Sequence, residues 1–302
     1  MTGKLDDRFV PFDREIYENY QISSCVGGLV SSWDKAEFVG AEEAHFLRDD
    51  DYVIGLKHNG VVRAYPIWVV DYYHVINDMV GGDPIMFVTC ERCQSGSAFI
   101  ARGESGKRLK FYAAGFYGAT LTICDRDGFL GGDSGIWIHY NAVAIHGRYL
   151  GTQLEQVPTF HHSWADWRAL HPDTDVMLPP DNPDHPDGRL DHGRDEYFCR
   201  PGMEMGAAQT INGLLDDQYP ENELILGLYA GKEAKAYPLR EVKKAGGVVE
   251  ESIDGVDLVV FSGPAPDQAT LSAYHRRVNN QTLSFFVKDG HFVDQKRKAS
   301  GI

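Results

Sequence analysis

The segment GLKHNGVVRAYP, Gly55 to Pro66, has a counterpart much later in the chain, GLYAGKEAKAYP, Gly227 to Pro238. Glycine, leucine, alanine, tyrosine and proline recur at the same places in the two segments. The similarity continues from Val75 in VINDMVGGDPIMFVT and from Val248 in VVEESIDGVDLVVFS, after the insertion of one residue. Such a repeat predicts that one supersecondary unit occurs twice in the chain.

The first copy carries clear signals for strands, turns and one short helix. Asn59-Gly60 between two apolar runs predicts a β-hairpin with a two-residue turn. Pro66 is suited to the first turn of a helix. Gly81-Gly82 predicts a second turn, which is followed by the β-branched run Ile85 to Thr89. The second copy has matching signals, including a turn at Asp254-Gly255.

Tight turns between strands, with few long helices, are typical of an α+β fold. The sequence therefore predicts mainly antiparallel β-sheet with short helices, built from two pseudo-symmetric repeats. We divide the chain into an N-terminal segment (1–50), a first repeat (51–145), a connecting segment (146–220) and a second repeat (221–302).

Composition restricts the partners of this 302-residue chain. Its net charge of −15 argues against binding to nucleic acid or to an anionic membrane, because both need a basic surface. The N-terminus lacks the apolar region of a signal peptide, and no apolar run is long enough to span a membrane. We therefore expect a cytoplasmic protein with a small-molecule partner, and its oligomeric state is left open.

The five cysteines are an odd number, and disulfides are rare in the cytoplasm, so a disulfide framework is not expected. Cys90 and Cys93 form a C-x-x-C pair within FVTCERCQSGSAF, which starts at Phe87. A thioredoxin-like pair would open a helix, whereas Gln-Ser-Gly-Ser is typical of a loop. A strand, C-x-x-C and a glycine instead indicate a metal knuckle.

The second copy serves as an internal control for these residues. It has Gly263 and Pro266 where the cysteines stand, and Gly246 where the first copy has His74. The shared frame therefore does not need these three side chains. His74 falls at i+7 from Ile67, on the predicted inward face of the helix after Pro66, and is the best third metal ligand.

A Cys₂His set leaves one coordination position open, as in catalytic zinc sites. His139 is a candidate for the fourth ligand. Thiolate and imidazole ligands suit zinc or copper(I), and iron less well. Tyr72, Tyr73 and Arg92 are near enough in sequence to line the approach, with two aromatic walls and one anion-binding group. The alternatives are a solvated turn residue for Arg92, and a dithiol redox pair or inert thiols for the cysteines.

The chain resembles the Domain of Unknown Function 3179 family. The resemblance rests on VIGLKHNGVVRAYP, YYHVINDMVGGDPIMFVTCERCQSGSAF, CDRDGFLGGDSGIW, HSWADWRALHPDT and the second LGLYAGKEAKAYP. His74, Cys90 and Cys93 fall on the family's histidine and on its C-P-x-C-G turn. The chain departs from that pattern at Glu91 and Gln94, and it has His139 where glutamine is expected. The family name implies no reaction.

These features predict a metal-dependent enzyme acting on a small molecule, specifically an oxidoreductase with a mononuclear Cys₂His site. The alternatives are a non-catalytic metal-binding or metal-carrying module, a dithiol redox protein, and a scaffold with a structural zinc ion.

Overall fold

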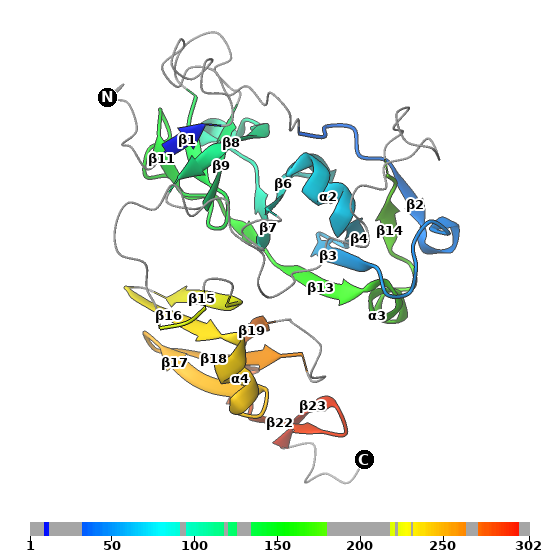
Figure 1. Cartoon of the computed structure of the whole chain (residues 1–302), viewed down its shortest axis with the longest axis vertical. Coiled ribbons are helices and arrows are strands. Elements are labelled where there is room, and N and C mark those ends of the chain that lie inside the picture. Colours follow the sequence, from blue (N-terminus) through cyan, green and yellow to red (C-terminus); the bar gives the residue numbers. More distant parts are fainter. Residues whose placement is uncertain are drawn as a thin grey trace. The chain divides into compact units, whose positions relative to one another are not determined.

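The computed structural model of the chain describes residues 9–11, 32–90, 95–117, 120–125, 134–179, 218–220, 223–230, 232–263 and 271–295. The chain divides into two compact units. Unit 1 comprises Met1–Phe198 and Glu204–Leu215, and unit 2 comprises Cys199–Met203 and Asp216–Ile302. Both consist mainly of antiparallel β-sheet with a few short helices, which confirms the predicted class (Figure 1).

Three sheets make up the described part of unit 1. The first has the order β1 (Phe9–Pro11), β8 (Phe111–Tyr117), β9 (Thr120–Asp125), β10 (Ile136–Ile138), β11 (Ala144–His146). The second is β12 (Gln156–Val157), β7 (Ser95–Ile100), β6 (Asp83–Cys90), β5 (Val75–Val80). The third is β13 (Thr159–Ser163), β3 (Tyr52–His58), β4 (Val61–Pro66), β14 (Asp175–Met177), β2 (Phe38–Gly40). The helices are α2 (Ile67–Tyr73) and α3 (Trp164–Leu170), with 3-10 turns at Ala41–Glu43 and Glu104–Gly106.

The second sheet packs on both of its faces. Met86 and Val88 of β6 share a core with Trp137 and other residues of the first sheet. Ile85 and Phe87 point to the opposite face and share a core with β3, β4 and α2. Because both faces are covered, β6 is an almost continuous apolar run rather than an alternating one.

The predicted hairpin turns of the first copy are confirmed. Asn59 and Gly60 between β3 and β4 have φ of 46° and 81°, and Gly81 and Gly82 between β5 and β6 have φ of 56° and 86°. Positive φ at both central residues is what a type I′ turn requires. A Cβ on Gly81 would lie 2.5 Å from the Asn59 Cβ, so the two turns pack closely against each other.

The position of His74 differs from the prediction. Helix α2 ends at Tyr73, and His74 is its C-terminal capping residue with φ 59° and ψ −35°. The expectation that His74 lies on the inward helical face is therefore wrong. The helical spacing ends one residue earlier, because the chain must turn sharply from α2 into β5.

Unit 2 contains the strands and helix of the second copy. The order is β15 (Ile225–Ala230), β16 (Glu233–Pro238), α4 (Leu239–Lys244), β17 (Val248–Ile253), β18 (Val256–Ser262) and β19 (Leu271–His275). Two small hairpins follow, β20 (Arg277–Val278) with β21 (Gln281–Thr282), and β22 (Phe285–Lys288) with β23 (His291–Asp294). The sequence of hairpin, short helix and hairpin in β15–β18 is also that of β3–β6 in unit 1.

Candidate functional site

The candidate site lies where β6 ends and β7 begins. Cys90 is the last residue of β6 and pairs directly with Ser95, the first residue of β7. The Cys90 side chain is buried in the core between the first and second sheets, whereas Ser95 is half-buried. Cys93 lies between them, outside the residues that the structure describes.

His139 approaches Ser95 from the first sheet. It follows β10 directly and is only 1% exposed. Its Nδ1 lies 2.9 Å from the carbonyl oxygen of Leu121, which can only accept a hydrogen bond, so Nδ1 carries the ring proton. Nε2 then holds the lone pair, and the Ser95 hydroxyl donates to it at 2.5 Å.

The protonation state of His139 follows from its surroundings. Burial, together with a smaller effect of the nearby His74, lowers the pKa of His139 to about 4, although the hydrogen bond to Leu121 opposes this shift. His139 is therefore neutral at physiological pH, the state in which imidazole binds metal ions.

His74 is held against the same strand end. Its Nδ1 lies 2.5 Å from the Asp71 carbonyl oxygen, so this nitrogen carries the proton in the neutral ring. Its own carbonyl accepts a hydrogen bond of 2.9 Å from the backbone N–H of Thr89, the residue before Cys90. The ring is close enough to His139 to depress the pKa of that residue.

Two neighbouring residues thus link three of the predicted ligands: Thr89 connects His74 to Cys90, and Ser95 connects Cys90 to His139. Both histidines donate Nδ1–H to a backbone carbonyl, an arrangement that fixes the tautomer and orientation of metal-binding histidines in proteins. Among the residues that the structure describes, which leave out Cys93, no three His, Cys, Asp or Glu side chains are grouped so as to hold a metal ion.

The cysteines differ from the expectation in their oxidation state. Cys90 and Cys124 are both disulfide-bonded in the structure, so the expectation that Cys90 is a thiolate and that disulfides are absent is wrong for this state. The expectation came from an odd cysteine count and an inferred compartment, and neither shows which sulfur atoms the fold brings within bonding distance. A role for Cys90 as a metal ligand requires reduction of its disulfide.

Comparison with known proteins identifies the family but no activity. The family model described as protein of unknown function (DUF3179) matches residues 30–301. The chain belongs to the DUF3179 family. No curated protein and no solved structure matches it.

Only one of the three residues predicted to line the approach to the site can be placed in this DUF3179 chain. Tyr73 is half-buried, and its ring packs against Trp33 with a centroid distance of 5.0 Å. The Tyr72 side chain and the whole of Arg92 lie outside the described residues. The Asp71 carboxylate is buried, but it is the backbone carbonyl of Asp71 that contacts His74.

Two residues of the site were missed by sequence reasoning. Ser95 was overlooked because its partner His139 is distant in sequence, although Ser95 and Ser97 place two hydroxyls on one face of a largely buried strand. Tyr140 was also overlooked. It is 51% exposed, and its ring is nearly perpendicular to the His139 ring at a centroid distance of 5.7 Å.

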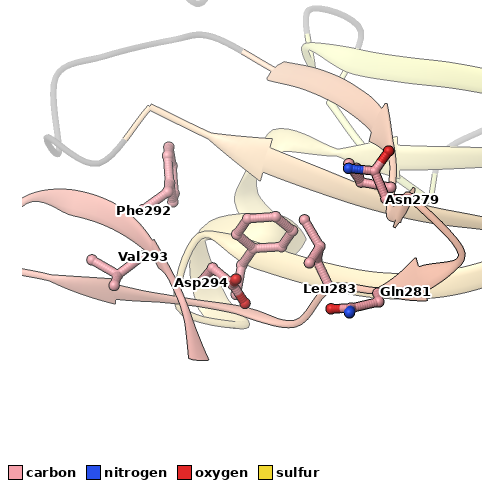
Figure 2. Close-up of a pocket in the computed structure, with 8 residues that line it drawn as sticks. Asn279, Gln281, Leu283, Phe292, Val293 and Asp294 are labelled. Atoms are coloured by element: carbon pink, nitrogen blue, oxygen red, sulfur yellow. The ribbon is translucent and has the colours of Figure 1, made fainter. Parts of the chain in front are cut away.

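A pocket of about 600 Å³ is present elsewhere, in unit 2 (Figure 2). Its walls combine apolar and polar side chains from the two small hairpins and the segments beside them: Val278, Asn279, Gln281, Leu283, Phe285, Phe292, Val293 and Asp294. No predicted site residue lines this pocket. No described helix has the length and apolarity needed to span a membrane.

Proposed function

We propose that the reduced protein binds one transition-metal ion through His74, Cys90, Cys93 and His139, and that it is a metal-dependent oxidoreductase acting on a small molecule. The observation that carries this proposal is that the two histidines have the same tautomer. Each has Nδ1–H directed at a backbone carbonyl, so that Nε2 is the nitrogen able to bind a metal. His74 is hydrogen-bonded to Thr89, the residue before Cys90, and His139 to Ser95, which pairs with Cys90.

The donor set suits this role. Two thiolates with one or two imidazoles are typical ligands of zinc and of copper(I), and suit iron less well. Of the two favoured ions only copper changes its oxidation state, so a redox reaction favours copper. When bound, the ion would supply either electron transfer or polarisation of a substrate oxygen.

The chain's own residues would hold and surround the ion. The carbonyls of Asp71 and Leu121 would keep the two imidazoles in the ligating tautomer. The exposed ring of Tyr140 lies beside His139 and would offer an apolar surface to a small substrate. Tyr72, Tyr73 and Arg92 are proposed to complete the approach to the site.

Metal analysis of the reduced, anaerobically handled protein tests this proposal. We expect one equivalent of copper or zinc in the wild type and its loss in Cys90→Ser. Cys124→Ser is the matched control, because Cys124 is also buried and disulfide-bonded but is not a proposed ligand. A folded, reduced wild type that stays free of metal would contradict the proposal.

A dithiol redox protein is the second candidate, because Cys90 is disulfide-bonded in the structure. In that case the protein would cycle between dithiol and disulfide without metal. Titration against glutathione buffers would show a reversible couple that Cys90→Ser abolishes. Observation of this couple in a protein that binds no metal would favour the second candidate over the first.

We also propose that the two units are pseudo-symmetric repeats and that only the first carries the site. Support comes from a tyrosine in each unit whose hydroxyl donates to an acidic side chain. The hydroxyl of Tyr65 donates to Asp78, and that of Tyr237 donates to Glu251. Each tyrosine stands directly before the proline that caps the following helix.

A further inference from the structure

We infer that the Ser95 hydroxyl competes with the metal ion for Nε2 of His139 and so stabilises the metal-free state of the site. This inference rests on the proposed function, since it concerns one of the proposed ligands. It goes beyond that proposal by assigning a regulatory role to a residue that cannot be recognised as part of the site from the sequence.

The competition follows from the number of lone pairs. In the neutral ring, with Nδ1–H bound to Leu121, the only in-plane lone pair of His139 is on Nε2. The Ser95 hydroxyl donates to this lone pair at 2.5 Å. One lone pair cannot accept this hydrogen bond and bind a metal ion at the same time, so binding requires Ser95 to release the ring.

The ring itself has little freedom to avoid this conflict. His139 is 1% exposed, and its Nδ1 contacts both the Leu121 carbonyl at 2.9 Å and the Thr120 hydroxyl at 3.2 Å. Turning the imidazole would break these contacts inside a packed core. The Ser95 side chain is half-buried and can move by rotation about a single bond.

The position of Ser95 makes it specific to this site. It is paired with Cys90 across the β6–β7 ladder, so it stands between two proposed ligands. The structure thus shows a state in which Cys90 is in a disulfide and His139 is occupied by Ser95. Reduction of the disulfide would free the Cys90 sulfur to bind a metal ion. Displacement of the Ser95 hydroxyl would free Nε2 of His139 in the same way.

Ser97 offers a matched control on the same strand. Its side chain is on the same face of β7, but its hydroxyl contacts the backbone carbonyl of Tyr140 at 3.5 Å rather than an imidazole. Removal of the Ser97 hydroxyl changes the polarity of this face in a similar way without freeing a proposed ligand.

The experiment measures the Zn²⁺ affinity of the full-length, reduced protein by competition with a chromophoric chelator. We expect Ser95→Ala to bind Zn²⁺ about fivefold more tightly than the wild type, the effect of losing one competing hydrogen bond. Ser95→Thr retains a hydroxyl and should remain close to the wild type, as should Ser97→Ala.

The possible results separate this inference from the proposed function. Equal or weaker binding by Ser95→Ala, with a wild type that binds Zn²⁺, overturns the inference and leaves the proposed function intact. If the wild type does not bind Zn²⁺ but Ser95→Ala does, the competition is supported. If neither variant binds, both proposals fail.

A measurement on the wild type alone covers the case in which Ser95→Ala does not fold. Imidazole ¹⁵N NMR of the reduced protein should show that Zn²⁺ shifts the Nε2 signal of His139 while its Nδ1–H signal stays in place. Zn²⁺ binding that leaves the Nε2 signal unchanged would overturn the inference.

Discussion

The region β3–β6 with α2 in unit 1 and the region β15–β18 with α4 in unit 2 have the same order of strands and helix but differ at the end of their helices. In unit 2 the chain leaves α4 through Gly246 and Gly247, with φ of 85° and 82°. In unit 1 the corresponding turn is made by His74, with φ 59°. Positive φ suits glycine and disfavours a residue with a Cβ.

At this turn the first region places a histidine in a backbone conformation that glycine adopts with less strain. A histidine in a position suited to glycine costs local stability, and such strain is often found at functional sites. Here the residue also contacts Asp71 and influences His139. The comparison therefore supports a role for His74 that the frame does not require.

The two regions also differ in how deeply the tyrosine before the capping proline is buried. Tyr65 is fully buried, and burial together with Asp78 raises its pKa well above the usual range. Tyr237 is 7% exposed, and burial and Glu251 also raise its pKa. Unit 1 adds β13 and β14 beside its first hairpin, whereas β15 and β16 form a two-stranded sheet within the described residues.

The largest expected effect comes from removing the acid that binds Tyr65. In unit 1, Asp78 accepts hydrogen bonds from Tyr65 at 2.7 Å and from Arg63 at 2.5 Å. Asp78→Ala removes the carboxylate that neutralises the half-buried Arg63 and accepts the buried Tyr65 hydroxyl, and should lower the free energy of unfolding by about 3 kcal/mol. Urea unfolding monitored by circular dichroism measures this.

Glu251→Ala is the matched variant in unit 2. Glu251 binds Tyr237 at 2.6 Å and also Lys235, but these groups are more exposed to solvent. The loss should be about 1 kcal/mol. Equal losses in the two variants would show that burial does not distinguish the two regions.

The next largest effect on stability is expected at Gly55, the first residue of GLKHNGVVRAYP, compared with Gly227, the first residue of GLYAGKEAKAYP. A Cβ on Gly55 would lie 2.2 Å from the Trp167 ring of α3, whereas a Cβ on Gly227 has no atom within 4 Å. Gly55→Ala should destabilise the protein by about 2 kcal/mol through overpacking. Gly227→Ala should change the free energy of unfolding by no more than about 0.5 kcal/mol. A neutral Gly55→Ala would contradict the packing of α3 on β3.

A smaller effect on stability is expected from the strained backbone of His74 at the end of α2. His74→Gly and His74→Ala both remove the imidazole, but only glycine accepts φ 59° without penalty. We expect His74→Gly to be more stable than His74→Ala by about 1 kcal/mol, measured from urea midpoints at equal slope. Equal stability would show that the chain relaxes from the positive φ when the ring is removed.

The smallest effect is a pH dependence at a position that carries a carboxylate in the first region and valine in the second. Asp83 accepts hydrogen bonds from Arg102 at 2.6 Å and from His58 at 2.7 Å, and these lower its pKa to about 2. A carboxylate with a depressed folded-state pKa stabilises the fold above its unfolded pKa of about 4, and this contribution is lost as the pH falls toward 2. The corresponding position in unit 2 is Val256.

Thermal unfolding of Asp83→Asn between pH 2 and pH 7 tests this linkage. The variant should be less stable than the wild type at pH 7, and the difference should shrink as the pH falls below 4. Asp254→Asn serves as a control, since it changes a turn carboxylate of unit 2. A difference for Asp83→Asn that is constant with pH would contradict the assignment.

The sequence by itself determined the local features of this protein. The turns at Asn59-Gly60 and Gly81-Gly82 were predictable, because positive φ depends on the residues that adopt it. The apolar run of β6 was predictable as a strand for the same local reason, since its side chains are β-branched or large. The order of hairpin, short helix and hairpin followed from these signals in both segments.

Only the tertiary structure decided how the candidate site is arranged. The contact between Ser95 and His139, the disulfide state of Cys90 and the end of α2 before His74 had no local signal strong enough to predict them. These features depend on which segments, distant from each other in the sequence, pack together in the folded chain. Long-range packing, unlike turn geometry, is set by the whole set of competing contacts in the folded chain.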